Sequence, residues 1–541
     1  MKHTKLLDCT LRDGAYLVDK EFGSSNIQGI IEGLVKARID CIEIGFFQDD
    51  GFGDGKTVYR NSAEATRYVP EDKQGCMFTV LADFSRYSID NLDEHRADSI
   101  DAVRECFFKH ERSEAIEACR RIKEKGYELF VQPVDILGYT DIELIEFIHQ
   151  VNGLEPYCLS IVDTFGSMFQ EDLHRVFEIV NHNLIPTCRV GFHSHNNMQL
   201  SNALSQEFIR MTYGKRKVVV DGTISGMGRG AGNTPTELIA QYMVSQLSYN
   251  YDMDALLDII DSYMDNIKSR CSWGYSTPYF IAGCYGAHVN NVAYLTKKNS
   301  IRSKDIRYIL NKVGADSRKR YDYDLLERTY MESMAADIDD SAAMGHLSYI
   351  LTGRDVLLLA PGSSVVAQQD AIRAFVDEKR PVVVSISFIH EAIPSDYVYV
   401  SNVKRYTWLR NQRAFVLHKK IIASNIKQCP KDATEYIISF PKLVKCGWEH
   451  MDNSIIMLLR LLDMFDVRSI AIAGFDGYSF GNDGSANYAN TDLELSNVRK
   501  DPGRLNEEIS NMLDDYMATR RHRTRIGFLT ESRFSRNLLE G

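Results

Sequence analysis

The sequence predicts an α/β protein: a (β/α)8 TIM barrel, then a helical segment, then a C-terminal Rossmann-like domain. Eight short apolar, β-branched runs alternate with amphipathic stretches through residues 1–250. Three motifs rich in polar residues and glycine close the first, seventh and eighth runs. The carboxyl ends of barrel strands form the face on which catalytic sites are built. An open doubly wound sheet shows the same alternation of strands and helices, but the count of eight strands and the motif positions favour the barrel.

The eight runs are predicted strands, and each is predicted to be followed by a helix. One such helix covers residues 111–125, where apolar side chains recur on one side. The predicted strands are Lys5–Cys9, Cys41–Phe47, Met77–Phe84, Ala102–Phe108, Leu129–Asp135, Cys158–Asp163, Arg189–His195 and Val218–Thr223.

Residues 251–350 are predicted to be helices with a polar linker, interrupted by an aromatic and glycine-containing stretch at 273–279. A new alternation of strands and helices occupies residues 351–541, which predicts the Rossmann-like domain. One helix is expected over residues 368–378. The predicted strands are Asp355–Ala360, Pro381–Ser387, Tyr397–Ser401, Ala414–His418, Glu435–Ser439 and Ser469–Ala473.

The composition excludes several classes of function. A formal net charge of −11 argues against general binding to nucleic acid or to anionic membrane surfaces. No apolar stretch is long enough to cross a bilayer, and Asp8 comes too early for a secretory signal. The 11 cysteines are scattered without a CxxC pair, which favours reduced thiols in the cytoplasm.

The first motif, Asp8–Cys9–Thr10–Leu11–Arg12–Asp13–Gly14, closes the first predicted strand. Asp13 offers a hard oxygen ligand for a metal ion. Arg12 offers a fixed cation beside it, suited to an oxyanion. A turn with a surface ion pair would explain the same residues equally well.

The second motif, Gly191–Phe192–His193–Ser194–His195, closes the seventh predicted strand. Residues two apart on a strand point to the same face, so His193 and His195 are predicted to aim together into the barrel mouth. Two imidazoles and a carboxylate are typical of Mn, Co, Fe or Zn sites with open positions. The alternative is a pair of packed core histidines.

The third motif is a glycine-rich loop that runs from Asp221 to Asn233 and precedes a predicted helix. Such a loop can bring backbone N–H groups close to an anion at a helix N-terminus. Asn233 also offers a neutral oxygen ligand. A flexible connector, or an N-cap at Asn233, is the alternative.

Together the three motifs resemble those of the DRE-TIM metallolyases, the HMGL-like family, over roughly residues 1–300. The run from Val220–Asp221–Gly222–Thr223 to Gly228–Arg229–Gly230–Ala231–Gly232–Asn233 is most similar to the 4-hydroxy-2-oxovalerate aldolase type. The resemblance implies a divalent-metal cofactor, Mn²⁺ first, with Mg²⁺, Co²⁺ or Zn²⁺ as alternatives. The ligands it implies are Asp13, His193, His195 and Asn233.

The resemblance also assigns roles to residues around the metal. It implies that Arg12 stabilises an enolate. Glu43 matches a site glutamate at the end of the second strand, where pairing with Arg12 for structure alone is the alternative. Asp163, at the end of the sixth strand, is expected to orient one of the metal ligands without contacting the metal itself.

The general base is where the sequence departs from the resemblance. The aldolase type has a histidine two residues after the glycine of the first motif, and Tyr16 stands there instead. A tyrosine could assist only with a lowered pKa or through water. His288, from the helices after the barrel, is a second candidate, although helix packing explains it more simply. The glycine-rich loop lacks the cysteine of HMG-CoA lyases, which counts against that substrate.

The function implied is a carbon–carbon lyase or synthase that handles a pyruvate-like 2-oxo acid as its enolate, with an aldehyde as partner. A Claisen-type acyl-CoA condensing enzyme is the alternative on the same barrel. A non-catalytic nucleotide-binding or assembly protein is the alternative from another class. By analogy with related barrels, a homodimer through the helices after the barrel is expected.

The C-terminal domain carries one further candidate site. Gly362, Ser363 and Ser364 follow a predicted strand and precede a helix, an arrangement that favours an anion such as a nucleotide phosphate. A purely structural turn is equally compatible with them. A nucleotide or nucleotide-sugar ligand would suit an aldolase that builds a sugar or polyol for a surface polysaccharide.

Overall fold

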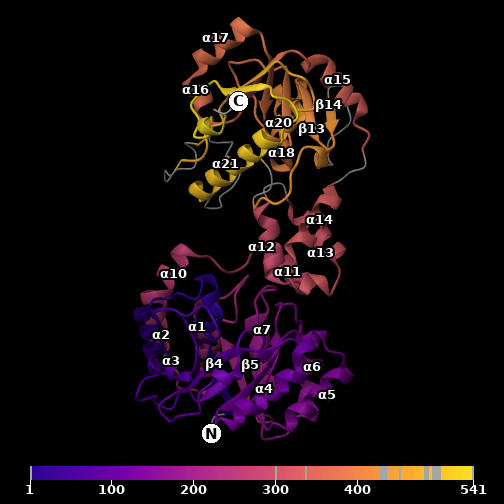
Figure 1. The fold of residues 1–541 in the computed structure, drawn as a ribbon. Helices are drawn as coiled ribbons and strands as arrows, with labels where there is room; N and C mark the ends of the chain where they lie inside the picture. Colours follow the sequence, from indigo (N-terminus) through magenta and orange to yellow (C-terminus); the bar gives the residue numbers. More distant parts are fainter. Residues whose placement is uncertain are drawn as a thin grey trace. The chain divides into compact units, whose positions relative to one another are not determined.

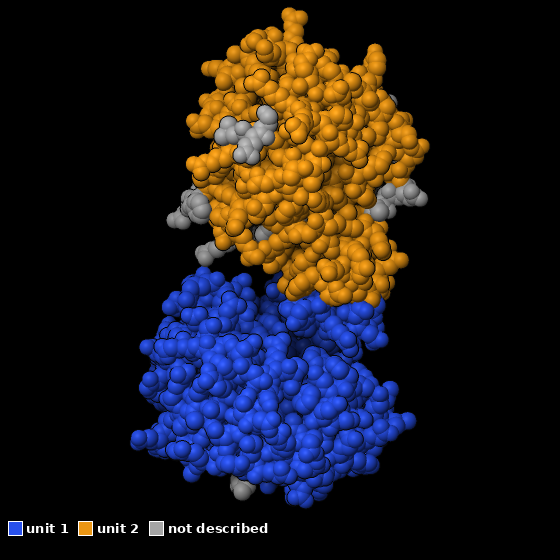
Figure 2. All heavy atoms as spheres, in the orientation of Figure 1, with its two compact units in different colours: residues 1–292, 314–321 blue, residues 293–313, 322–541 orange. Residues whose placement is uncertain are grey.

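The computed structural model describes residues 3–298, 301–334, 338–426, 435–449, 453–479, 487–489 and 501–538. It divides into two compact units, Met1–Val292 with Gly314–Tyr321, and Ala293–Val313 with Asp322–Gly541 (Figure 2). Each unit contains one parallel sheet, and the helices of residues 251–350 are shared between the units. Among the described residues, no helix has the length and apolar character needed to span a membrane.

The first unit is a closed (β/α)8 barrel of parallel strands, which confirms the predicted fold class (Figure 1). The strands pair in the order β1-β2-β4-β5-β6-β7-β8-β9, and β9 pairs with β1 to close the sheet. A two-residue strand, β3 (Val58–Tyr59), adds to β2. The barrel strands are β1 Thr4–Asp8, β2 Cys41–Phe47, β4 Met77–Asp83, β5 Ala102–Phe107, β6 Glu128–Pro133, β7 Cys158–Asp163, β8 Arg189–Ser194 and β9 Val218–Gly222.

Helices cover the outside of the barrel, with one departure from the expected pattern. The connection from β4 to β5 contains only a 3-10 turn, Ile89–Asn91, where a helix was expected. Residues 93–98 of this connection are almost wholly charged or polar, so it lacks an apolar face to pack. The helices are α1 Thr10–Asp13, α2 Ser24–Lys36, α3 Ser62–Thr66, α4 Arg112–Glu124, α5 Asp141–Asn152, α6 Gln170–Asn183, α7 Ser201–Thr212 and α8 Thr236–Leu247.

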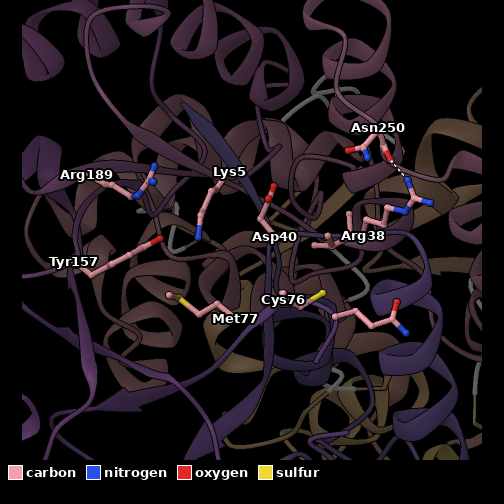
Figure 3. A pocket seen from close by; sticks show the side chains of 11 residues that line it. Lys5, Arg38, Asp40, Cys76, Met77, Tyr157, Arg189 and Asn250 are labelled. Carbon is pink, nitrogen blue, oxygen red and sulfur yellow. Dashed lines mark hydrogen bonds between the residues drawn. The ribbon is translucent and has the colours of Figure 1, made fainter. Parts of the chain in front are cut away.

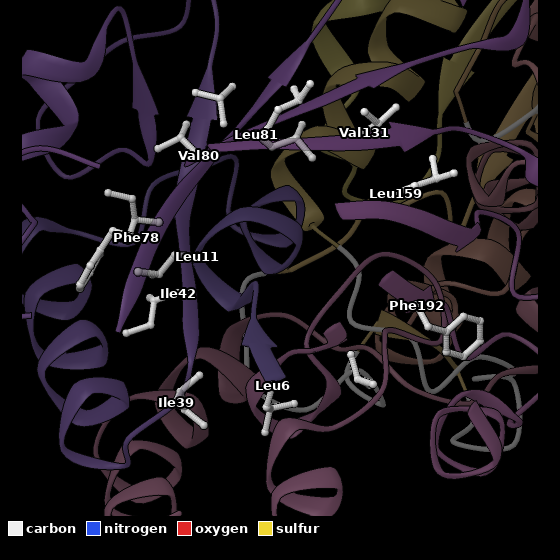
Figure 4. Packing of buried hydrophobic residues seen from close by; sticks show 14 of the residues in the cluster. Leu6, Leu11, Ile39, Ile42, Phe78, Val80, Leu81, Val131, Leu159 and Phe192 are labelled. Atoms are coloured by element: carbon white, nitrogen blue, oxygen red, sulfur yellow. The ribbon is translucent and has the colours of Figure 1, made fainter. Parts of the chain in front are cut away.

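Strand alternation separates two sets of buried side chains in the barrel. Outward-facing residues such as Leu6, Ile42 and Phe192 pack with the helices in the main core (Figure 4). A small inner cluster fills the middle of the barrel: Leu7, Cys9, Cys41, Ala102, Phe130, Cys158 and Val219. Two residues further along their strands, the same alternation turns polar side chains inward at the carboxyl end: Glu43, Arg104 and Asp221.

The helices that follow the barrel strands are mostly short. A π-helical turn, Ile260–Met264, joins the first two of them. The helices are α9 Met253–Ile259, α10 Asp265–Arg270, α11 Thr277–Tyr285, α12 Val289–Lys297, α13 Ser303–Val313, α14 Tyr323–Met334 and α15 Ser341–Leu351.

The second unit contains a seven-stranded parallel sheet in the order β14-β13-β12-β11-β10-β15-β16. The chain runs outward from β10 to β14 and then crosses to the other side of β10, so β10 and β15 flank a topological switch point. The strands are β10 Asp355–Leu359, β11 Val382–Ile386, β12 Tyr397–Val400, β13 Lys419–Ala423, β14 Glu435–Ile438, β15 Ser469–Ala473 and β16 Arg525–Phe528. The helices are α16 Ser364–Ala367, α17 Gln369–Lys379, α18 Val403–Leu409, α19 Arg413–Leu417, α20 Ser454–Leu462 and α21 Pro502–Thr519.

One predicted strand of this sheet was wrong. Residues 414–417 belong to the helix α19, and the strand β13 begins after His418, at Lys419. A short apolar run fits a helix turn or a buried strand equally well by periodicity. Strand β16 was not predicted. It is a short strand at the edge of the sheet, and in its four residues an arginine and a glycine alternate with two apolar residues.

A glycine in β2 is required for the backbone path beside the site. Gly45 has φ +152° and lies where the β2–β4 register shifts between Glu43 and Phe46. A Cβ there would come within 2.3 Å of the Thr57 carbonyl oxygen. We expect Gly45→Ala to lower the free energy of unfolding by about 1–3 kcal/mol, measured by urea denaturation.

The matched control is Gly153→Ala. Gly153 ends α5 with φ −66°, and its added Cβ would meet only an ordinary contact at 3.4 Å. Its effect is expected within about 0.5 kcal/mol. Equal stabilities for the two variants would show that the backbone at Gly45 accepts a side chain.

Candidate active site

The first motif forms a fixed turn at the end of β1. Asp8 accepts hydrogen bonds from the Thr10 N–H (3.0 Å) and from the Thr236 hydroxyl (2.6 Å). The Thr10 hydroxyl in turn accepts from the Ile224 N–H at 2.7 Å. These contacts tie the turn to the end of β9, and Arg12 and Asp13 are both buried there.

His193 of β8 and His195, directly after this strand, converge on Asp13. The Nε2 atoms of His193 and His195 lie 3.1 and 3.5 Å from Asp13 Oδ2. His195 Nδ1 donates to the Asp163 carbonyl oxygen at 3.0 Å, and His193 Nδ1 faces Asp221 Oδ2 at 3.0 Å. An imidazole that donates from Nδ1 presents its Nε2 lone pair on the other side, as metal-ligating histidines do.

Asn233 lies beside this group. It forms a β-bridge with His195, and its Nδ2 donates to the Met227 carbonyl oxygen at 3.1 Å. Its buried Oδ1 has no hydrogen-bond partner among the described residues, whereas Asp13 Oδ2 lies 3.2 Å from the Arg12 guanidinium. An unpartnered amide oxygen, a carboxylate oxygen and two Nε2 lone pairs are donors that suit a divalent cation.

A second grouping of potential ligands includes a cysteine. Ligand atoms of Cys9, Asp13 and His193 lie within 4.8 Å of one another. Burial, however, raises the pKa of the Cys9 thiol well above its usual value, and Sγ donates to the Gly222 carbonyl oxygen at 3.3 Å. Because a thiol ligates metal as the thiolate, Asp13 with the two histidines is the better donor set.

Arg12 and Glu43 belong to a buried ion-pair network that crosses the barrel. Arg12 Nε donates to Glu43 Oε2 at 2.7 Å, and Arg12 Nη1 lies 3.2 Å from Asp13 Oδ2. Arg104 Nη1 lies 3.2 Å from the same Glu43 oxygen, and Arg104 Nη2 donates to Asp221. Glu43 therefore orients both guanidinium groups.

Arg104 and Asp221 are site residues whose roles the sequence motifs do not reveal. An arginine in the middle of an apolar strand, in the register of inward-facing residues, was the available signal for Arg104. Asp221 stands in the third motif, but only the structure places it on His193. Glu43 contacts Arg104, Arg104 contacts Asp221, and Asp221 contacts His193. A shift of Glu43 would therefore move the ring of His193.

The electrostatics of the network favour ionised side chains. Although burial opposes it, Arg12 and the two histidines hold the pKa of Asp13 well below its usual value. Burial likewise opposes ionisation of Asp221, but Arg104 and His193 keep its pKa low. Three carboxylates face two guanidinium groups, so the network has an excess of negative charge that a bound cation would balance.

Asp163 and Tyr16 make contacts that the sequence alone does not specify. The backbone carbonyl of Asp163, rather than its carboxylate, orients His195. The carboxylate accepts from the Ser167 N–H at 2.9 Å and so shapes the loop after β7. Burial raises the pKa of Tyr16, although the Arg229 guanidinium 3.8 Å from its ring centre opposes the shift. A phenol with a raised pKa is a proton donor rather than a base.

His288 also has the properties of a donor. Burial, with Arg229 and His195 nearby, lowers its pKa to about 3. Its Nδ1 accepts from the Asn290 N–H at 3.1 Å, so the neutral ring carries its proton on Nε2. The base role expected of His288 does not fit these contacts.

The turn in the second unit is already occupied by a carboxylate. Gly362, Ser363 and Ser364 lie at the switch point, where the Gly362 N–H donates to the Gly474 carbonyl oxygen at 2.8 Å. Asp476 accepts from the Ser364 N–H at 2.7 Å and from the hydroxyls of both serines. A phosphate at this turn would be repelled by the negative charge of Asp476. A ligand hydroxyl could instead donate a hydrogen bond to that carboxylate.

Comparison with known proteins assigns the barrel to a family. Residues 3–262 match the HMGL-like family model. The barrel is therefore an HMGL-like domain, which confirms the resemblance found in the three motifs.

Curated relatives match about half of the chain, as the following shares show. A 4-hydroxy-2-oxovalerate aldolase of Thermomicrobium roseum is 28% identical over 258 residues, 46% of this chain and 69% of the relative. An oxaloacetate decarboxylase of Mycobacterium tuberculosis is 26% identical over 306 residues, 54% of this chain and 84% of the relative. The N-terminal domain of a putative aldolase from Bacteroides vulgatus, a solved structure, has 23% identity and a TM-score of 0.48 over 54% of this chain and 96% of its own.

Arg104→Met tests the ion-pair network. The change removes the cation between Glu43 and Asp221 and leaves two buried carboxylates underpaired, so we expect stability to fall by about 3–5 kcal/mol in urea denaturation. Arg120→Met is the control, since Arg120 is exposed and pairs with Glu117 of the same helix, α4. A loss below about 1 kcal/mol for Arg104→Met would contradict the network's role.

The affinity for Mn²⁺ should depend on pH through His193. Burial lowers its pKa, but contacts with Asp13 and Asp221 outweigh burial and raise it above 6.5. A proton on His193 competes with the ion, so affinity should rise with pH and level off only above pH 6.5. Asp221→Asn removes one raising contact and should move this midpoint to lower pH in calorimetric titrations. An unchanged midpoint would show that His193 does not control binding.

Proposed function

We propose that the barrel is a divalent-metal-dependent aldolase that makes or breaks a carbon–carbon bond through the enolate of a 2-oxo acid. The supporting observation is the approach of Asp13 Oδ2 to the Nε2 atoms of His193 and His195, with Arg12 alongside. The curated relatives named above are carbon–carbon lyases, which supports the reaction class.

The ligands proposed are Asp13, His193, His195 and Asn233. A bound divalent ion, Mn²⁺ by the chemistry of these donors, supplies Lewis acidity toward the keto oxygen of the 2-oxo acid. Asp221 and the Asp163 carbonyl keep the two imidazoles oriented through their Nδ1 atoms. The proposed role of these contacts is to hold the ligand atoms in place before the ion arrives.

Arg12 is proposed to stabilise the enolate oxygen. Glu43 engages the Nε edge of the guanidinium, which fixes the plane of the group and leaves further N–H groups to donate. Burial in the barrel strengthens such a donor toward developing negative charge. Glu43 is accordingly proposed to position Arg12 and not to exchange protons.

Proton transfer at the aldehyde oxygen is proposed to use Tyr16. In the condensation direction an alkoxide forms, and an alkoxide is basic enough to take the proton of a phenol. Arg229, stacked on the Tyr16 ring, stabilises the phenolate that results. The methyl proton released when the enolate forms passes to solvent, which returns a proton to Tyr16. His288, protonated at Nε2, is proposed to donate a hydrogen bond to the substrate.

The acceptor aldehyde is proposed to be polyhydroxylated, as in a sugar or polyol destined for a surface polysaccharide. A cavity of about 620 Å³ lies beyond the carboxyl ends of β2 and β4, lined by Lys20, Gln48, Ser85 and Arg86 among others. Among the lining residues, Lys20 and Arg86 can only donate, whereas the carboxylates of Asp49 and Asp50 accept, and such a mixture suits hydroxyl groups. In the second unit, a nucleotide or nucleotide-sugar is proposed at the β10–β15 switch point, with its hydroxyls toward Asp476.

A second candidate is decarboxylation of a 2-oxo diacid, favoured by the similarity to the oxaloacetate decarboxylase. It proceeds through the same enolate and would use the same ligands and Arg12. Release of CO₂ from oxaloacetate, compared with condensation of pyruvate and an aldehyde, distinguishes the two reactions.

Exchange of the pyruvate methyl protons in D₂O, followed by NMR, tests the proposal directly. Exchange should require Mn²⁺ and stop with EDTA. Arg12→Lys keeps the charge but loses the planar fork, so we expect exchange to slow about 100- to 1,000-fold while Mn²⁺ affinity stays within about threefold.

The control is Arg67→Lys, an exposed arginine of the same unit, which should exchange at the wild-type rate. Exchange that persists in EDTA would contradict the metal requirement. An Arg12→Lys rate near that of wild type would contradict the role of Arg12.

A further inference from the structure

A cavity of about 540 Å³ lies at the end of the barrel opposite the candidate active site. It is lined where strands begin: Lys5 of β1, Asp40 just before β2, Met77 of β4, Tyr157 just before β7 and Arg189 of β8. Arg38, which follows α2, completes one side (Figure 3). The size falls within the range of small-molecule sites.

The lining carries an excess of positive charge. Lys5, Arg38 and Arg189 are cationic, and Asp40 is the one acidic residue among the lining residues. Asp40 Oδ2 already accepts from the Leu6 N–H at 3.0 Å and from the Tyr251 hydroxyl. In the described part of the chain, no carboxylate lies within ion-pair distance of the three cations.

Arg189 is a buried cation held by neutral partners. Only 5% of the residue is exposed, and Nη1 donates to the carbonyl oxygens of His3 (3.3 Å) and Val218 (3.4 Å). Carbonyls satisfy the N–H groups but do not neutralise the charge. A buried guanidinium without a counter-ion is costly, and a ligand oxyanion would lower that cost.

Tyr157 adds a hydrogen-bond donor at the same place. Lys5 Nζ and the Arg189 guanidinium carbon each lie 5.5 Å from the centre of its ring. The buried hydroxyl has no acceptor among the described residues, because its neighbour Lys5 can only donate. Figure 3 shows the Lys5, Tyr157 and Arg189 groups on one side of the cavity.

The cavity is separate from the candidate active site. The inner apolar cluster lies between them, and the Phe130 ring faces Tyr157 at 5.1 Å on one side and Arg104 at 5.6 Å on the other. Ile39, Cys76 and Met77 give the cavity an apolar part. An oxyanion with a compact carbon body would use both the cations and this apolar part.

We propose that this cavity, at the amino ends of the barrel strands, binds a small organic oxyanion, a phosphate ester or a dicarboxylate. The anion accepts from Lys5, Arg189 and the Tyr157 hydroxyl. Since the ligand binds only the folded barrel, it should stabilise the protein as its concentration rises. The alternative role for these cations is structural: they would offset the partial negative charge at helix C-termini on this face, such as that of α2.

Calorimetric titration of the full chain with glycerol 3-phosphate, succinate and inorganic phosphate tests the proposal. We expect saturable binding of one organic probe, and the probe that binds identifies the oxyanion. Lys5→Met should weaken it at least tenfold, and Tyr157→Phe severalfold. Lys217→Met is the matched control: it removes a lysine near the same face that does not line the cavity, and should change affinity less than twofold.

EDTA separates this site from the metal site. Binding that survives EDTA supports the proposal, whatever the outcome of pyruvate exchange. Binding lost in EDTA would place the anion at the metal and overturn the proposal. It would also be overturned if no probe bound saturably, or if Lys5→Met and Lys217→Met weakened binding equally.

Discussion

The site depends on one buried carboxylate that faces two imidazole nitrogens. Asp13 lies on α1, just after β1, and His193 and His195 lie at the end of β8, yet both Nε2 atoms are within 3.5 Å of Asp13 Oδ2. Burying this charge is unfavourable unless cations surround it, and Arg12 supplies one of them. The rest of the polar layer follows from that need: Glu43 and Asp221 balance Arg12 and Arg104, and Asp221 also fixes His193.

The barrel explains why these residues need not be close in sequence. Parallel strands bring all their carboxyl ends to one face, and alternation turns every second side chain inward. The same alternation produces three levels within the barrel: polar residues at the carboxyl end, an apolar middle with Phe130, and cations at the amino end. The two ends can therefore hold different ligands within a single domain.

Much of the fold was predictable because it rests on local patterns. Eight apolar runs gave eight barrel strands, and two histidines two residues apart indicated a shared direction. The helix α19 and the strand β13 were confused because a short apolar run has no decisive period. Arg104 could not be assigned a role, because its partners Glu43 and Asp221 lie on other strands. The direction of the Tyr16 pKa depends on burial, which the sequence does not reveal.

The most direct test of the central claim is a crystal structure of the Mn²⁺-soaked protein, with anomalous diffraction recorded at the manganese edge. We expect one strong anomalous peak within about 2.0–2.4 Å of Asp13 Oδ2 and of both histidine Nε2 atoms. A peak bound by the Cys9 sulfur without His195, or no peak between β1 and β8, would contradict it.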